Sequence, residues 1–167
     1  MTGAEKEMIL VLDIGTSFLK CGCIDSENNI ITRNERVFPM SHHQTTYETD
    51  FNVFFNTVVD LLNECMAHTL VRQSGVKALL ITSQAQTFVP VDEGFSPLRS
   101  GIVWLDERAG KEATWIMEHL PDFAGKAGLH TALSGLYASK LLWLKRNEPS
   151  LFNGAGAFPL IQVISEC

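Results

Sequence analysis

The segment at residues 8–17, MILVLDIGTS, constrains the fold more than any other part of the sequence. Its run of apolar residues predicts a buried strand, and Asp13 follows where that strand would emerge from the core. Gly15, Thr16 and Ser17 then predict a tight polar turn, because glycine allows a close approach of backbone or ligand. The sequence therefore predicts a strand that delivers a carboxylate to a glycine-containing turn at a sheet edge.

The residues after this turn predict two further strands. Residues 18–24 alternate between apolar and polar side chains, which places Leu19, Cys21 and Cys23 on one face of a strand. A cluster of turn-forming residues follows, and the stretch 30–37 predicts a third strand. The chain is therefore expected to open with a three-strand antiparallel meander.

The four cysteines, Cys21, Cys23, Cys65 and Cys167, follow neither a zinc-site spacing nor a disulfide framework. Cysteines two apart share a strand face, so Cys21 and Cys23 are predicted to pack side by side as small apolar residues. Free thiols of this kind are typical of a reducing compartment, and we expect a cytoplasmic protein.

The rest of the chain alternates between helical and extended patterns, which predicts an α/β fold with a mixed sheet and helices on both faces. The final segment is apolar and the chain stops soon after it, so we expect an incomplete domain. The expected elements are a polar loop at 41–46, a helix from about 51 to 72, a buried strand at 76–82, a strand pair at 88–91 and 101–105, helices at about 106–120 and 134–146, a loop at 123–133 and a core element at 157–164.

The charge balance argues against nucleic acid and membrane partners. Lys and Arg total 13 against 19 Asp and Glu, which gives a net charge of −6. Nucleic acids and anionic membranes require a basic face, and no Lys/Arg cluster supplies one. No apolar run approaches the roughly 20 residues that span a bilayer.

The turn at residues 13–17 is the first candidate site. Successive turn N–H groups can form an anion-binding concavity, and a carboxylate beside it suits Mg²⁺ that arrives with phosphate oxygens. An ordinary capped hairpin turn is the alternative, because Asp, Gly, Thr and Ser are common turn residues. The sequence contains no P-loop motif, and no dinucleotide-binding G-x-G-x-x-G follows the first strand.

A second candidate cluster combines Gln84, Gln86, Trp104, Asp106 and Arg108. Amides and carboxylates can bind the hydroxyls of a polyol, and an indole can cover its apolar face. In the alternative interpretation Trp104 belongs to the core, Asp106 caps the next helix, and Arg108 forms an ion pair at the surface.

Taken together and in this order, the segments resemble the FGGY carbohydrate kinases over nearly the whole chain. The D-x-G-T-[ST] element alone is shared with the wider group of actin-like ATPases, whereas the W-x-D-x-R element and the helix with the pattern S-K-L-L-W-L-K-x-N-E-P are typical of sugar kinases. The matching stretches are LVLDIGTS at 10–17, YETD at 47–50, ITSQ at 81–84, VPVDEGFSPLRSGIVWLDERA at 89–109 and ASKLLWLKRNEPSLF at 138–152.

This resemblance implies a ribonuclease-H-like, actin-like ATPase domain that forms the first lobe of a two-lobed kinase. Such enzymes transfer the γ-phosphoryl group of ATP, with Mg²⁺, to a hydroxyl of a sugar or polyol. By resemblance, the metal and nucleotide site comprises Asp13, near the metal, with Gly15, Thr16 and Ser17 near the phosphates. The sugar site comprises Gln84, Ala85, Gln86, Trp104 and Asp106.

Two departures from the family pattern matter. Where glycerol kinases carry Arg-Glu and xylulose kinases carry Met-His, this chain has Ala85 and Gln86, so neither substrate is supported. The catalytic Asp of the family and the C-terminal lobe lie beyond residue 167, so residues 1–167 are expected to be a partial N-terminal lobe without kinase activity of its own. An unfinished sheet edge would also favour a homo-oligomer.

Two other hypotheses remain open at this point. The chain could be a non-catalytic module that keeps the lobe to bind nucleotide, sugar or another protein. A ribonuclease-H-like nuclease would need several carboxylates that converge on two metals, and Asp13 has only the distant Asp92 and Asp106 as candidate partners.

Overall fold

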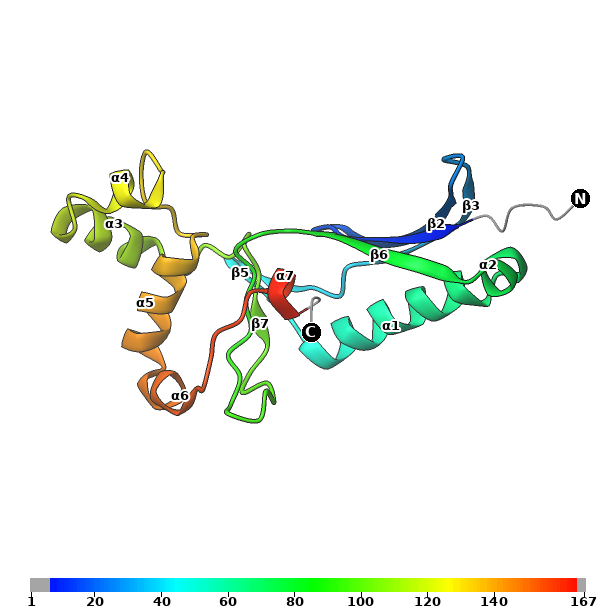
Figure 1. The fold of residues 1–167 in the computed structure, drawn as a ribbon. Coiled ribbons are helices and arrows are strands. Elements are labelled where there is room, and N and C mark those ends of the chain that lie inside the picture. The colour runs from blue at the N-terminus through cyan, green and yellow to red at the C-terminus, as the bar shows by residue number, and fades with distance from the viewer. Residues whose placement is uncertain (1–6, 165–167) are drawn as a thin grey trace, which may run out of the picture. The chain divides into compact units, whose positions relative to one another are not determined.

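The computed structural model describes residues 7–164, which fall into two compact units (Figure 1). Unit 1 contains residues up to Pro39 together with Asn52–Gln84, and unit 2 contains Met40–Phe51 and the residues from Ala85 onward. No helix in the described part of the chain is long and apolar enough to cross a membrane.

Unit 1 is built on a four-stranded mixed sheet whose spatial order is β3-β2-β1-β6. The strands β1 (Met8–Ile14), β2 (Phe18–Asp25) and β3 (Ile30–Val37) run antiparallel in succession, which confirms the predicted meander. The fourth strand, β6 (Val76–Ser83), pairs with β1 in parallel. In this register Asp13 lies opposite Lys20 on one side and Thr82 on the other.

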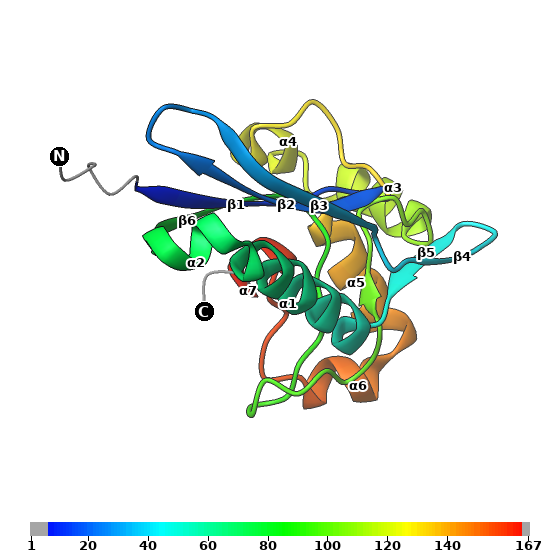
Figure 2. The same cartoon turned by 90° about the vertical axis from the view of Figure 1, so that its right-hand side faces the viewer.

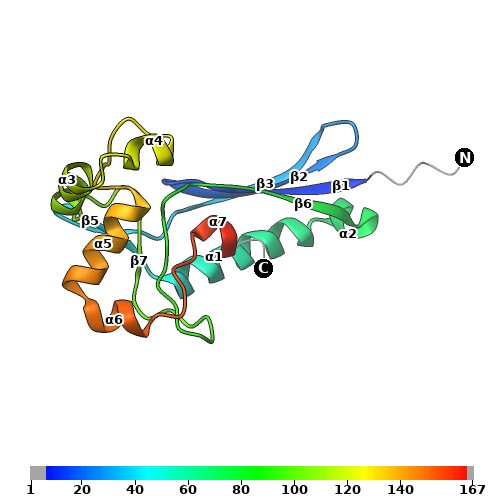
Figure 3. The ribbon, with the colours of Figure 1, turned by 60° about the vertical axis from the view of Figure 1, so that its left-hand side comes forward.

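A helix covers one face of this sheet. Leu10, Leu12, Cys21 and Cys23 are buried on that face, as the alternating pattern predicted. The long helix α1 (Phe51–Ala67) runs along the sheet (Figure 3). Its buried residues form one stripe: Phe54, Val58, Leu61 and Cys65.

The predicted helix at 51–72 is divided in two. After α1, His68 interrupts the helix with an extended backbone and begins α2 (Thr69–Ser74). Two apolar residues of α1, Phe55 and Met66, lie outside the buried stripe, and they are 48% and 41% exposed. Only one side of a helix faces the sheet, and residues at the border of the apolar stripe remain in solvent.

The strand β6 exists as predicted, but the expectation that it is buried is wrong within unit 1. Leu79 and Leu80 are 44% and 54% exposed. The cause is topological, because within residues 7–164 β6 is an edge strand of this sheet and pairs with β1 alone. An apolar run identifies a strand but not whether a neighbour covers it.

Unit 2 begins with residues that were expected to form a polar loop and instead form a small hairpin (Figure 2). The strands β4 (Ser41–His43) and β5 (Thr46–Thr49) pair antiparallel, and β5 also pairs with β7 (Gly101–Ile102). The helices of unit 2 are α3 (Gly110–His119), α4 (Phe123–Ala127), α5 (Tyr137–Asn147), α6 (Pro149–Gly154) and α7 (Ile161–Ile164).

Two helix starts and one additional helix in unit 2 differ from the predictions. The first turn of α3 begins at Gly110, four residues after the predicted start at Asp106, and no side chain caps it. Likewise α5 begins at Tyr137, three residues after the predicted start at Ser134, which is not its cap. The segment expected to be a loop at 123–133 contains the short helix α4.

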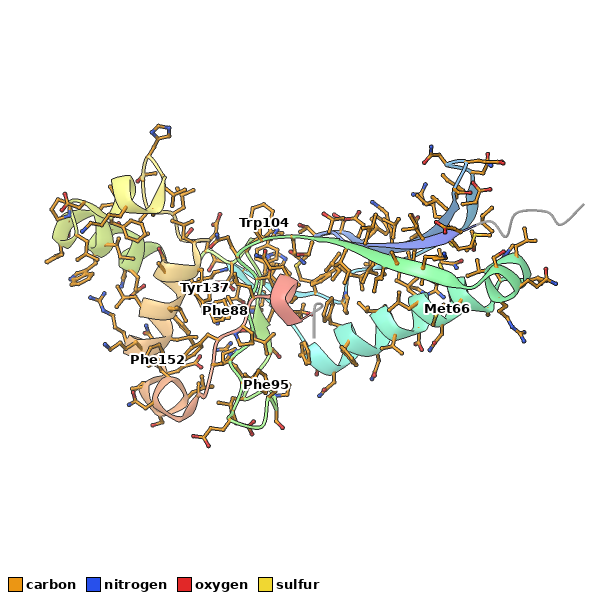
Figure 4. The ribbon with its side chains drawn as sticks, in the orientation of Figure 1. Met66, Phe88, Phe95, Trp104, Tyr137 and Phe152 are labelled. Carbon is orange, nitrogen blue, oxygen red and sulfur yellow. The ribbon has the colours of Figure 1, made fainter. Side chains whose placement is uncertain are left out.

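The core of unit 2 forms around Phe88, Ile102 and Leu144, which have no exposed surface. Phe88 and Ile102 exchange two backbone hydrogen bonds, of 3.2 and 2.9 Å, so the predicted strand pair exists in a short form. The Tyr137 ring meets Phe88 edge-on at 5.0 Å between centroids, and both are labelled in Figure 4. This packing fixes the start of α5 against the 85–104 segment.

Candidate functional site

The turn after β1 is closed by the backbone of Gly15. Its N–H donates a hydrogen bond of 3.1 Å to the Phe18 carbonyl oxygen. A Cβ atom at position 15 would lie 2.9 Å from that same oxygen, so the turn requires glycine. The Gly15 N–H is thus used to close the turn, and the placing of Thr16 and Ser17 near the phosphates stays a prediction.

Asp13 presents its carboxylate on the face of the sheet opposite α1. Its side chain is 40% exposed, and Oδ2 lies 3.6 Å from the Lys20 Nζ. The carboxylate also lines a hollow of about 210 Å³ together with Val11, Lys20 and Gly22. It is therefore accessible to a ligand and is not consumed by internal packing.

These residues suit a metal that arrives with its own ligands. Within residues 7–164 no group of three or more His, Cys, Asp or Glu side chains could hold a metal ion by itself. Magnesium commonly binds one or two carboxylates and completes its shell with water and phosphate oxygens. A single accessible carboxylate beside a cationic lysine fits such a metal–phosphate pair better than a permanent metal cage.

The residues predicted to bind sugar are divided between the two units. Gln84 follows β6 in unit 1, where its N–H donates a 2.8 Å hydrogen bond to the Ile14 carbonyl beside the glycine turn. Ala85, which is exposed, Gln86, Trp104 and Asp106 all belong to unit 2.

Unit 2 contains a hollow of about 330 Å³ that two of the predicted residues line, Gln86 and Trp104. The Trp104 side chain, labelled in Figure 4, is 41% exposed, so the alternative that places it in the core is wrong. A Cβ atom on Gly135 would lie 2.5 Å from the Trp104 carbonyl oxygen, which means that the opposite wall packs directly on this backbone. We call this feature the Trp104 hollow; its lining is Gln86, Trp104, Leu105, Glu107, Leu133, Ser134, Gly135 and Leu136.

Gln86 lies in the wall of the hollow with an unusual backbone. Its φ of +64° is in the left-handed region that non-glycine residues rarely adopt. Its side-chain Oε1 accepts a 2.7 Å hydrogen bond from the Tyr137 N–H, at the start of α5. Its backbone oxygen accepts a 2.6 Å hydrogen bond from the Lys140 Nζ. Gln86 is therefore held at both its side chain and its backbone.

Asp106 lies behind the hollow and has no exposed surface. Its carboxylate accepts hydrogen bonds from the Tyr47 N–H at 2.7 Å and the Arg108 N–H at 3.0 Å. The Arg108 guanidinium also binds it in a bidentate manner, at 2.8 and 2.7 Å. Asp106 is thus not the cap of α3, and its direct contact with a sugar stays a prediction.

Arg108 is not paired at the surface, since its side chain is only 9% exposed and contacts two carboxylates. Burial alone would lower its pKa, but hydrogen bonds to Asp106 and Glu48 raise the pKa above its ordinary value. The guanidinium also lies 5.0 Å from the centre of the Trp143 ring. Arg99 joins the same network through Glu48 and Glu148, so these ion pairs link β5, the loop after β7 and the end of α5.

Three residues near the hollow were not singled out by the sequence: Glu107, Gly135 and Lys140. Glu107 lies inside the W-x-D-x-R element, between Asp106 and Arg108, and this position in the motif could have indicated that it lies near the site. Gly135 precedes α5, in a stretch that was interpreted as the entry to that helix. Lys140 lies within the SKLLWLK pattern, where a lysine ordinarily indicates a solvent-facing position.

The family model described as the FGGY family of carbohydrate kinases, N-terminal domain, matches residues 8–164. The chain belongs to this family. Among FGGY proteins, the xylulose kinase of Staphylococcus epidermidis is 27% identical over 156 residues, which are 93% of this chain and 31% of that protein. The glycerol kinase of Thermococcus gammatolerans is 28% identical over 145 residues, or 86% of this chain and 29% of that protein.

Solved FGGY structures confirm the predicted fold class. The "xyloylose kinase" of Brucella ovis superposes with a TM-score of 0.84 at 26% identity, covering 92% of this chain and 32% of that one. The Plasmodium falciparum glycerol kinase with ADP gives a TM-score of 0.78 at 27% identity, covering 89% and 30%. This FGGY chain thus has the mixed sheet and helices of an actin-like ATPase domain and spans about a third of the length of its relatives.

Proposed function

We propose that this chain supplies the nucleotide-facing turn and part of the sugar site of an ATP-dependent carbohydrate kinase. The observation that carries the proposal is Asp13, which a family-matching strand delivers, still accessible, to a turn that only glycine can close. The magnesium–ATP complex would supply the transferable γ-phosphoryl group. Asp13 would hold the metal, and Thr16 and Ser17 would contact phosphate oxygens.

The Trp104 hollow is the proposed acceptor site. Trp104 offers an exposed indole face, Gln86 and Glu107 offer polar groups, and a volume of about 330 Å³ suits a small sugar or polyol. Gln84, Ala85 and Asp106 are retained in the proposal as family positions. Asp106 would act mainly by orienting Arg108 and β5, because its carboxylate is buried.

Residues 1–167 would then be a partial N-terminal lobe, and phosphoryl transfer would need the catalytic Asp and the second lobe of the family. The 31% coverage of the relatives supports this division. We expect the purified chain to show no ATP-dependent phosphorylation of any member of a panel of sugars and polyols above a no-enzyme control. We also expect the cytoplasm as its compartment, which fractionation of the source cell would test.

Calorimetry with magnesium–ADP tests the nucleotide part of the proposal. We expect weak binding that Asp13→Asn weakens by roughly tenfold, or about 1.4 kcal/mol. Asp60→Asn is the matched control, because Asp60 is an exposed aspartate on α1 in the same unit. Equal affinities for the wild type and Asp13→Asn would exclude the proposed metal role of Asp13.

A further inference from the structure

Lys140 is the unexpected residue near the Trp104 hollow. It lies on α5 with no exposed surface, although Lys145 on the same helix is exposed. A buried ammonium is unfavourable unless its donors find acceptors. Lys140 Nζ donates to the Gln86 carbonyl oxygen at 2.6 Å and to the Val103 carbonyl oxygen at 3.2 Å, and lies 5.6 Å from the centre of the Phe88 ring.

One acceptor belongs to a residue that lines the hollow, and the other belongs to the residue just before a lining residue. Gln86 lines it directly, and Val103 immediately precedes Trp104. A second link joins the same segments, because the Trp104 N–H donates a 3.0 Å hydrogen bond to the Thr87 Oγ1. Lys140 does not line the hollow itself, so it acts on the two walls from behind.

We propose that Lys140 is a positioning residue of the Trp104 hollow, whose ammonium group holds the Gln86 and Trp104 walls at a fixed separation. The link to sugar binding rests on the function proposed above for the hollow.

The strained backbone of Gln86 favours this role over simple packing. A left-handed glutamine persists only where the surrounding structure determines it. Two contacts do so here: the Tyr137 N–H holds the side chain of Gln86, and Lys140 holds its carbonyl oxygen. Loss of the ammonium would release the second of these contacts and allow the wall to relax.

The two hydrogen bonds from Lys140 to the Gln86 and Val103 carbonyl oxygens are expected to depend on pH. Burial lowers the pKa of Lys140 to about 8; the carboxylate of Asp106 opposes this shift and the guanidinium of Arg108 adds to it. Both charged groups come from the loop after β7, and Glu48 of β5 is bonded to Arg108. Hydrogen bonds from a neutral amine are weaker than those from an ammonium, so the walls should loosen as pH rises through about 8.

Amide resonances measured by NMR test the proposal directly. The amides of Thr87 and Trp104 share peptide bonds with the two acceptor carbonyls, and both should shift with one midpoint near the pKa of about 8. The same midpoint should appear at the Lys140 side-chain resonances. Lys140→Met should abolish the shift of both amides, whereas Lys145→Met, an exposed lysine on the same helix, should leave it unchanged.

Binding of a panel of small sugars and polyols, followed by tryptophan fluorescence, is the second measurement, and Lys140→Met should weaken the binding of any member that the wild type binds by roughly tenfold. The proposal is overturned if the two amides do not titrate, if they still titrate in Lys140→Met, or if sugar affinity is unchanged in that variant. Should Lys140→Met fail to fold, different midpoints for the amides and for Lys140 in the wild type would overturn it equally. If the wild type binds no member of the panel, the proposed function fails, while the titration still decides the positioning role.

Discussion

Each unit carries one aspartate that the sequence singled out, and the two occupy opposite environments. In unit 1 the Asp13 side chain is 40% exposed and has one ion pair, to Lys20 at 3.6 Å. In unit 2 the Asp106 side chain has no exposed surface and accepts four hydrogen bonds, three of them from Arg108. Both lie in family motifs, yet Asp13 is accessible to a ligand, whereas Asp106 is buried and stabilises the surrounding structure.

The largest expected effect comes from Asp106→Asn. This change leaves the Arg108 guanidinium, 9% exposed, without its bidentate partner, and loss of one member of a buried pair costs about 3–5 kcal/mol. Urea unfolding followed by tryptophan fluorescence measures it, because Trp104, Trp115 and Trp143 all lie in unit 2. Asp122→Asn is the control: this side chain is 83% exposed, and its loss should change stability by at most about 0.5 kcal/mol. A loss below about 1 kcal/mol for Asp106→Asn would contradict the contrast between the two aspartates.

The next effect is the pH dependence that Lys140 gives to unit 2. Its pKa is lowered from 10.5 to about 8 in the folded state, so between these pH values the unfolded chain binds more protons than the folded one. The free energy of unfolding should therefore rise across this window, by up to about 3 kcal/mol in total from this group. Lys140→Met should remove the rise in urea unfolding curves and Lys145→Met should keep it; parallel pH profiles for wild type and Lys140→Met would contradict the assignment.

A smaller effect is expected at the turn of unit 1. Gly15→Ala places a Cβ atom 2.9 Å from a backbone oxygen that cannot move independently, which should cost about 1–3 kcal/mol. Hydrogen exchange of peptides from β1 and β2 is the suitable measurement, since the tryptophans report unit 2. Gly110→Ala is the control, because its Cβ would have no neighbour within 4 Å at the start of α3. Unchanged exchange in Gly15→Ala would show that the turn tolerates a side chain.

The smallest effect on stability is expected for Asp13→Asn. Exposed ion pairs contribute little, so the free energy of unfolding should change by less than about 0.5 kcal/mol, even though magnesium–ADP binding weakens. Calorimetric melting of wild type and variant would measure this difference. A loss as large as that of Asp106→Asn would mean that Asp13 is also a structural residue and would remove the distinction between the units.

The sequence predicted unit 1 well where the signal was local. The run at 8–13 and the alternation of Leu19, Cys21 and Cys23 gave the strands, their buried face and the meander, because strand periodicity is a property of neighbouring residues. The exposure of Leu79 and Leu80 could not be predicted, since it depends on which strand lies beside β6 and not on β6 itself.

The candidate site of unit 2 was predicted only in part, for the same reason. Gln86 and Trp104 were found from their residue types, and the structure places both in one hollow. The role of Asp106 depends on Tyr47, which lies 59 positions away in the sequence, so a local pattern could suggest only a helix cap. The burial of Lys140 could not be predicted from the sequence either, because its acceptors are backbone carbonyl oxygens, which every residue has.

The hydrogen bond between the Gln86 side chain and the Tyr137 N–H has a consequence for how this protein can diverge. Residue 86 both borders the pocket and supplies the acceptor that begins a helix 51 positions later in the chain. A change there that altered ligand preference, for example to a bulky apolar residue, would at once expose an unsatisfied amide and shorten that helix. If the hollow binds the acceptor as proposed, we expect residue 86 to change only to residues whose side chain can accept this hydrogen bond, or together with a compensating change at the helix start.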